Sequence, residues 1–131
     1  MNIFLCTIPG TGTYFFRDLL EKHGCSVKAL HCSKEGMVRA KEYVEKGYVL
    51  VTAWRDVEET KNNWVLMNRS LDEYDLYYRN WHQLFEYEPV VVSFSNNREA
   101  RLELLGAVIG KKLETDWTPV NQHPKETGGI K

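Results

Sequence analysis

Several features that assign proteins to specialised classes are missing from this chain of 131 residues. Lys and Arg number 17 against 18 for Asp and Glu, so the formal net charge of −1 gives no general attraction for nucleic acid or anionic membranes. No apolar run reaches the length of a membrane span. The start of the chain lacks a basic segment followed by a long apolar segment, so we expect no signal peptide. We therefore expect a cytoplasmic protein with neither nucleic acid nor membrane among its partners.

Cysteine is scarce and odd in number. The three cysteines are Cys6, Cys25 and Cys32, which cannot all pair within one chain, and this favours a reducing, intracellular setting. His23 and His31 lie near two of them, but no CxxC or HxxxH spacing is present, so we expect no metal site. Small thiols buried in strands are the simpler interpretation.

Short apolar runs alternate with helical patterns along the chain. Four runs have the length and composition of strands: residues 2–8, 25–32, 48–54 and 89–95. The first is continuously apolar, which indicates a strand buried on both faces. A helical pattern follows each of the four runs, which predicts parallel strands joined by crossover helices. We therefore predict an α/β fold in three α/β/α layers, with a mainly parallel sheet of four to five strands. Residues 1–131 form one domain in this prediction, and about 115–131 form an irregular tail.

Capping residues indicate where the helices begin. Ser33 and Asp56 are each expected to cap a helix, and Ser70 precedes a helical pattern with the spacing of a capping box. Asn96 or Asn97 is expected to cap a last long helix. The apolar face of that helix consists of Leu102, Leu105, Val108 and Ile109.

The segment between the first strand and the first helix is Pro9–Thr13, with the sequence PGTGT. Gly10 and Gly12 allow backbone angles that bring main-chain N–H groups close to an anion, and the hydroxyls of Thr11 and Thr13 add donors. The following helix directs its positive end at the same point. Ligands of open parallel sheets bind at the carboxyl ends of the strands, where this loop lies. The loop thus predicts a phosphate site; the alternative is a turn that needs glycine for its geometry alone.

This loop contains no lysine. The pattern GK[ST], with which nucleotide triphosphatases supply a lysine to the β and γ phosphates, is absent from the sequence. A small nucleotide kinase is therefore the least favoured of the nucleotide-binding functions. A glycine-rich loop at a helix N-terminus can still hold a phosphate through its N–H groups.

The segment CTIPGTGTYFF resembles the 5′-phosphosulfate loop of the sulfotransferase family, usually written T-x-P-K-S-G-T-x-W ahead of a helix. Four residues match this pattern: Thr7, Pro9, Gly12 and Thr13. Thr11 replaces the family's serine, Phe15 its tryptophan, and Gly10 the lysine that contacts the departing phosphate. The resemblance places the whole loop from Pro9 to Tyr14 around the donor nucleotide.

The segment VLVTAWRDVEETKNNW looks like the family's 3′-phosphate element. Arg55 and Asp56 match its Arg-Asp/Asn pair after a strand, Val57 replaces a proline, and Asn63 stands for the serine eight residues after the arginine. His31 falls where the family has a strand that ends in Lys-Thr-His, and it matches the catalytic base. The later elements also find counterparts, so the resemblance covers most of the chain.

The resemblance implies a fold of the P-loop nucleotide-binding type and an enzyme that uses 3′-phosphoadenosine 5′-phosphosulfate (PAPS). A sulfuryl group would pass to the hydroxyl or amine of an acceptor that the sequence does not identify, leaving 3′-phosphoadenosine 5′-phosphate (PAP). In these roles Arg55 makes a bidentate contact to the 3′-phosphate and Asn63 donates to the same phosphate. His31 takes the proton of the acceptor.

The missing loop lysine leaves two interpretations open. Another cation reaches the site, with Lys28, Lys34 and Arg17 as candidates, or the protein is a nucleotide-binding or interaction module that has lost transferase chemistry. The chain is also shorter than typical members of the family. This suggests an open site, a large acceptor or a homo-oligomer.

Overall fold

A computed structural model describes residues 1–94 and 100–113. The strands are β1 (Asn2–Thr7), β2 (Ser26–His31), β3 (Val49–Trp54), β4 (Val90–Phe94) and β5 (Ala100–Arg101). The α-helices are α1 (Thr13–Lys22), α2 (Lys34–Glu45), α3 (Val57–Leu66), α4 (Tyr74–Gln83) and α5 (Glu103–Ile109). Two 3₁₀ turns, η1 (Leu71–Glu73) and η2 (Leu84–Tyr87), precede and follow α4.

The five strands form one sheet in the order β2-β1-β3-β4-β5. The pairs β1–β2, β1–β3 and β3–β4 are parallel, and β5 is antiparallel to β4. The register aligns Thr7 with His31, so β1 and β2 end side by side. The predicted α/β class and the mainly parallel sheet are confirmed.

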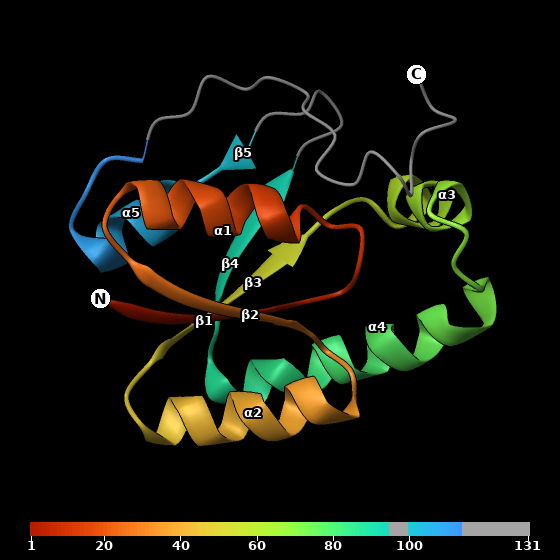
Figure 1. Ribbon diagram of the computed structural model, residues 1–131, viewed down its shortest axis with the longest axis horizontal. Helices are drawn as coiled ribbons and strands as arrows, with labels where there is room; N and C mark the ends of the chain where they lie inside the picture. Colours follow the sequence, from red (N-terminus) through yellow and green to blue (C-terminus); the bar gives the residue numbers. More distant parts are fainter. Residues whose placement is uncertain (95–99, 114–131) are drawn as a thin grey trace.

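The helices lie in two layers, one on each side of the sheet (Figure 1). On one side α1 and α5 pack against Ile3 and Leu5 of β1 through Phe16, Leu20 and Leu105. These residues are all buried, as a strand covered on both faces requires.

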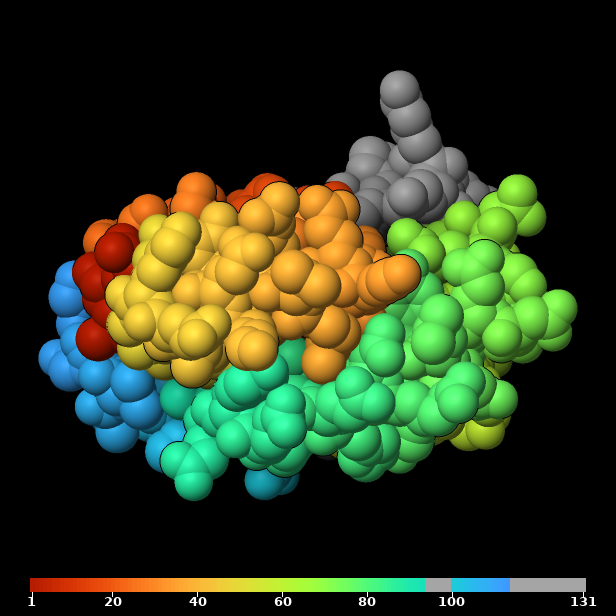
Figure 2. Space-filling view, turned by 90° about the horizontal axis from the view of Figure 1, so that it is seen from below, coloured from red at the N-terminus to blue at the C-terminus, as the bar shows by residue number. Residues whose placement is uncertain are grey.

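The opposite side is covered by α2 and α4, which lie side by side in Figure 2. Here the alternate residues of β1, Phe4 and Cys6, pack in a second core with Ala40, Trp64 and Trp81. The Trp81 Nε1–H donates to Thr52 Oγ1 at 2.8 Å, and that hydroxyl donates to the Cys6 carbonyl at 2.6 Å. This buried chain of hydrogen bonds ties α4 to two strands of the sheet.

The helix beginnings follow the predicted capping residues with one difference. Ser33 Oγ accepts from the Gly36 N–H and caps α2, and Asp56 Oδ2 accepts from the Glu59 N–H and caps α3. Ser70 caps the 3₁₀ turn η1 instead of an α-helix, and α4 begins only after that turn. A capping box indicates where a helical turn begins, but it does not determine whether that turn has the hydrogen bonds of a 3₁₀ helix or of an α-helix.

The prediction for the last helix was wrong at its beginning. Asn96 and Asn97 lie outside the described residues, as does the predicted tail of residues 115–131, but Ala100 and Arg101 pair with β4 as β5, and α5 begins only at Glu103. A two-residue strand is too short to give a periodic signal, so its pairing depends on the neighbouring strand. Of the predicted apolar face, Leu102, Leu105 and Ile109 pack into the core, whereas Val108 is exposed.

Among the described residues, none of the helices combines the length and the apolar character that a membrane crossing needs.

Candidate functional site

The strand order reverses between β1 and β3, at the carboxyl ends of these two strands. The connection after β1 leads to β2 on one side, whereas the connection after β3 leads to β4 on the other side. Ligands of doubly wound sheets bind where the order reverses in this way. The loop from Ile8 to Gly12 follows β1, and Arg55 follows β3, so the sheet brings both to this switch point.

Side chains at the end of β3 and on α3 hold the carbonyl groups of the loop. Arg55 Nη1–H donates to the Gly10 carbonyl at 3.2 Å, and Asn63 Nδ2–H donates to the same oxygen at 3.3 Å. Trp64 Nε1–H donates to the preceding carbonyl, that of Pro9, at 2.6 Å. The structure therefore brings Arg55 and Asn63 together with the glycine loop.

These contacts fix the direction of the loop N–H groups. All peptide bonds of the described chain are trans, and the C=O and N–H of a trans peptide point in opposite directions. Because the carbonyls of Pro9 and Gly10 point at α3, the N–H groups of Gly10 and Thr11 point away from it.

The backbone conformation of the loop makes its N–H groups converge. Gly10 and Gly12 have positive φ angles of 85° and 96°, whereas Thr11 and Thr13 do not, so the handedness alternates along four residues. Such alternation forms a concave group of N–H donors that binds anions. Within the described residues, the N–H groups of residues 10–13 donate to no acceptor. Four consecutive main-chain donors of the loop are therefore not used within the described part of the chain.

The beginning of α1 differs from the beginnings of α2 and α3. Its N-cap is Gly12, which has no side chain with which to cap the helix, whereas Ser33 and Asp56 cap the other two. The positive end of the α1 dipole therefore lies at the same loop as the four N–H groups.

The threonine hydroxyls of the loop, expected to add donors for an anion, are used inside the protein. Thr11 Oγ1–H donates to the Ile8 carbonyl at 2.7 Å, and Thr13 Oγ1 lies 2.6 Å from Thr7 Oγ1. Both loop threonines are buried. They stabilise the shape of the loop, which leaves the main-chain N–H groups as its candidate donors for an anion.

Of the candidate replacement cations, only Lys34 lies at the carboxyl edge of the sheet. It is exposed and is the first residue of α2, just after β2 ends. Lys28 lies in the middle of β2, opposite Phe4. The Arg17 guanidinium lies over the Tyr14 ring and forms an ion pair with Asp18 at 3.0 Å.

His31 ends β2 next to Thr7, from which the glycine loop starts, and its side chain is half-buried. Two hydrogen bonds hold the main chain of Cys32, the residue after His31. The Cys32 N–H donates to the Thr7 carbonyl at 2.8 Å, and Asn80 Nδ2–H of α4 donates to the Cys32 carbonyl at 2.8 Å. The main chain at His31 is therefore held rigidly beside the loop.

Gly36 has a steric role behind His31. Alanine in place of an exposed helical glycine usually stabilises a protein. At Gly36, however, the added Cβ atom would overlap the His31 carbonyl oxygen. We therefore expect Gly36→Ala to destabilise the protein by about 3 kcal/mol, since backbone atoms must move. Urea unfolding monitored by circular dichroism measures this change. A stabilising effect would contradict the steric argument.

The cysteines do not form a reactive centre. Cys6 and Cys32 are buried free thiols, and burial raises the pKa of Cys6 to about 12 and raises that of Cys32 as well. Thiols with raised pKa values stay protonated at neutral pH and are poor nucleophiles. Within the described residues, no group of three His, Cys, Asp or Glu side chains is arranged to hold a metal ion.

Two residues at the site, Glu59 and Trp64, were not among the predicted site residues, although Trp64 stands where the family's 3′-phosphate element has an aromatic residue. Glu59 Oε1 lies 3.8 Å from Arg55 Nη2, and Trp64 holds the Pro9 carbonyl. Glu59 and Asn63 are four residues apart, a spacing that places them on one side of α3, and Arg55 lies just before the start of that helix.

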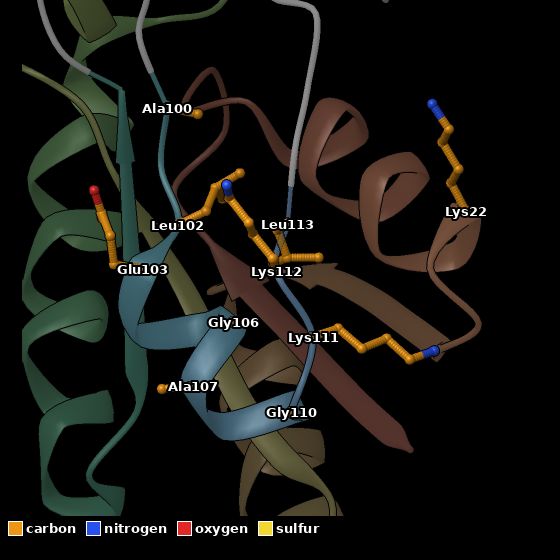
Figure 3. A pocket seen from close by; sticks show the side chains of 10 residues that line it. All are labelled: Lys22, Ala100, Leu102, Glu103, Gly106, Ala107, Gly110, Lys111, Lys112 and Leu113. Atoms are coloured by element: carbon orange, nitrogen blue, oxygen red, sulfur yellow. The ribbon is translucent and has the colours of Figure 1, made fainter.

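A pocket of about 1010 Å³ lies elsewhere, between α5, β5 and the end of α1 (Figure 3). Three lysines line it, Lys22, Lys111 and Lys112. Lys111 reaches the end of α1, where its Nζ donates to the His23 carbonyl at 2.6 Å. This ammonium group is used to hold α1, and the glycine loop does not line the pocket.

Comparisons of the chain with protein-family models, with curated proteins and with solved structures gave no match.

Proposed function

We propose that this protein is a sulfotransferase-like enzyme of the P-loop nucleotide-binding type, which binds PAPS and its product PAP. The observation that supports this proposal most is the group of four N–H donors at residues 10–13, which are unused within the described residues and lie beside Arg55 at the carboxyl ends of β1 and β3. Such a group is suited to a phosphate, and a guanidinium nearby is suited to a second one. A nucleotide with phosphates at both ends of its ribose meets both requirements.

In this proposal the loop N–H groups and the α1 dipole hold the 5′-phosphate, while Arg55 and Asn63 bind the 3′-phosphate. A guanidinium has five N–H donors, so one side chain can hold the Gly10 carbonyl and contact a phosphate as well. Both side chains already lie at the loop, so little rearrangement is needed when the nucleotide binds.

The residues support transfer of a sulfuryl group as follows. As the acceptor oxygen or nitrogen bonds to sulfur, the bond between sulfur and the phosphate oxygen breaks, and PAP leaves with that oxygen. The N–H groups of residues 10–13 stabilise the negative charge that develops on the leaving phosphate. His31 takes the proton that the acceptor loses.

The second candidate is a nucleotide-binding protein without transferase activity. It is favoured by Gly10, which stands where the family has its lysine. A Cβ at Gly10 would lie 3.2 Å from atoms of Asn63, Trp64 and Met67, so the loop packs directly on α3 where the lysine would start. Single-turnover transfer from labelled donor to a broad panel of acceptors distinguishes the two candidates.

Calorimetric titration with PAP, ATP and AMP tests the binding proposal. We expect PAP to bind most tightly, because AMP lacks the 3′-phosphate and ATP places its additional phosphates at the 5′ end. Preferential binding of ATP would instead favour a nucleotide kinase.

Arg55→Ala is expected to weaken PAP binding by about 100-fold, because the 3′-phosphate loses its charged partner. AMP binding should change less, since AMP has no 3′-phosphate. Arg39→Ala is the matched control, because Arg39 is an exposed arginine of α2 that pairs with Glu42. Calorimetry measures all three affinities. Equal losses for PAP and AMP would mean that Arg55 acts only through the Gly10 carbonyl.

A further inference from the structure

Glu59 is an acidic side chain at the candidate site, and its main chain is held in place. Its N–H donates to the capping carboxylate of Asp56 at 3.1 Å, so the main chain of Glu59 is held in the first turn of α3. Its Oε1 lies 3.8 Å from Arg55 Nη2, and the two side chains are only 30% and 26% exposed.

The second carboxylate oxygen of Glu59 is unusual. Glu59 Oε2 is buried and has no hydrogen-bond partner among the described residues. A carboxylate oxygen that is withdrawn from water and left without a donor is unfavourable for the folded state. Stability therefore does not explain this side chain, and a role in binding must be considered.

Two roles are conceivable for a carboxylate next to a phosphate-binding arginine. It either orients the guanidinium, which strengthens ligand binding, or it competes with the ligand for the guanidinium, which weakens binding. The separation of 3.8 Å exceeds hydrogen-bond distance, whereas the Gly10 carbonyl accepts from Arg55 at 3.2 Å. The loop carbonyl orients Arg55, and the carboxylate contributes mainly its charge.

We propose that Glu59 is a specificity-determining residue that acts as a built-in competitor for Arg55, an inference that rests on the nucleotide site proposed above. Its negative charge repels a phosphate bound by the guanidinium, and this repulsion grows with the charge of the ligand. The site therefore limits its affinity for the bisphosphorylated product more than for AMP. The enzyme can thus release PAP after each transfer.

The test compares Glu59→Gln with Glu58→Gln. Glu58 is the preceding residue of α3 and is exposed, so both variants remove one negative charge from the same turn. We expect Glu59→Gln to bind PAP about 10-fold more tightly than the parent at low ionic strength, and the gain to shrink as salt is added. We expect Glu58→Gln to change the affinity by no more than about twofold, because an exposed charge is screened. AMP should gain less than PAP.

Calorimetry with PAP and AMP measures these affinities, and circular dichroism checks that each variant is folded. Glu59→Ala is a second variant that also removes the charge and should also bind PAP more tightly. If the parent binds PAP and neither Glu59 variant exceeds Glu58→Gln, the competitor role is overturned and the proposed function stands. If neither the parent nor the Glu59 variants bind PAP, both proposals fall.

Discussion

Replacing Trp64 with alanine is expected to lower the free energy of unfolding by about 3–5 kcal/mol. Trp64 is fully buried, and its ring packs edge-on against Tyr74 and Tyr77 at centroid distances of 5.4 and 5.5 Å. Its Nε1–H also donates to the Pro9 carbonyl. The substitution leaves a large cavity and a loop carbonyl that has lost its donor, and both effects destabilise the folded state.

Urea unfolding monitored by far-ultraviolet circular dichroism measures this loss. Trp54→Ala is the matched control, because Trp54 is 40% exposed, and we expect it to change the stability by no more than about 0.5 kcal/mol. Trp64→Phe retains most of the packing but removes the indole donor, so it should fall between the two. Equal stability of the Trp64→Ala and Trp54→Ala variants would contradict the assignment of Trp64 to the core.

His31→Ala is expected to reduce the rate of sulfuryl transfer by about 10²- to 10⁴-fold while PAP binding stays unchanged. The side chain lies at the end of β2 next to the strand from which the loop starts, and the main chain around it is held by Thr7 and Asn80. In the proposed reaction, a histidine at this end of β2 takes the proton of the acceptor. The donor nucleotide is held by other residues in this proposal, so its affinity should not depend on His31.

Single-turnover transfer from labelled PAPS and calorimetry with PAP measure the two quantities separately. His82→Ala serves as the control, because His82 is an exposed histidine of α4. Equal transfer rates in parent and variant would rule out the assignment of His31 as the base. A variant that loses both transfer and PAP binding would show that His31 supports the shape of the site instead.

The sequence predicts the parallel core of the fold well, because local signals and tertiary packing agree there. Continuous apolar runs such as residues 2–8 are buried on both faces, and Ser33 and Asp56 cap helices as expected. The prediction failed at Ala100 and Arg101, where pairing with β4 decides the conformation. Such pairing depends on distant residues, which short-range patterns do not record.

The candidate site is predictable in part for a similar reason. Parallel strands end at the same edge of a sheet, so the sequence suffices to expect Arg55 near the glycine loop. The inward direction of the Thr11 hydroxyl and the contact between Arg55 and Glu59 depend on rotamers. Those details require the three-dimensional structure.

The two hydrogen bonds to the Gly10 carbonyl make the formation of the site depend on the folding of the chain. Their donors, Arg55 and Asn63, are separated from Gly10 by 45 and 53 residues in the sequence. Closing such long segments of chain costs conformational entropy, so contacts of this kind slow folding. We therefore expect a chain in which β1, β3 and α3 are not yet packed together to contain the loop residues without the loop conformation.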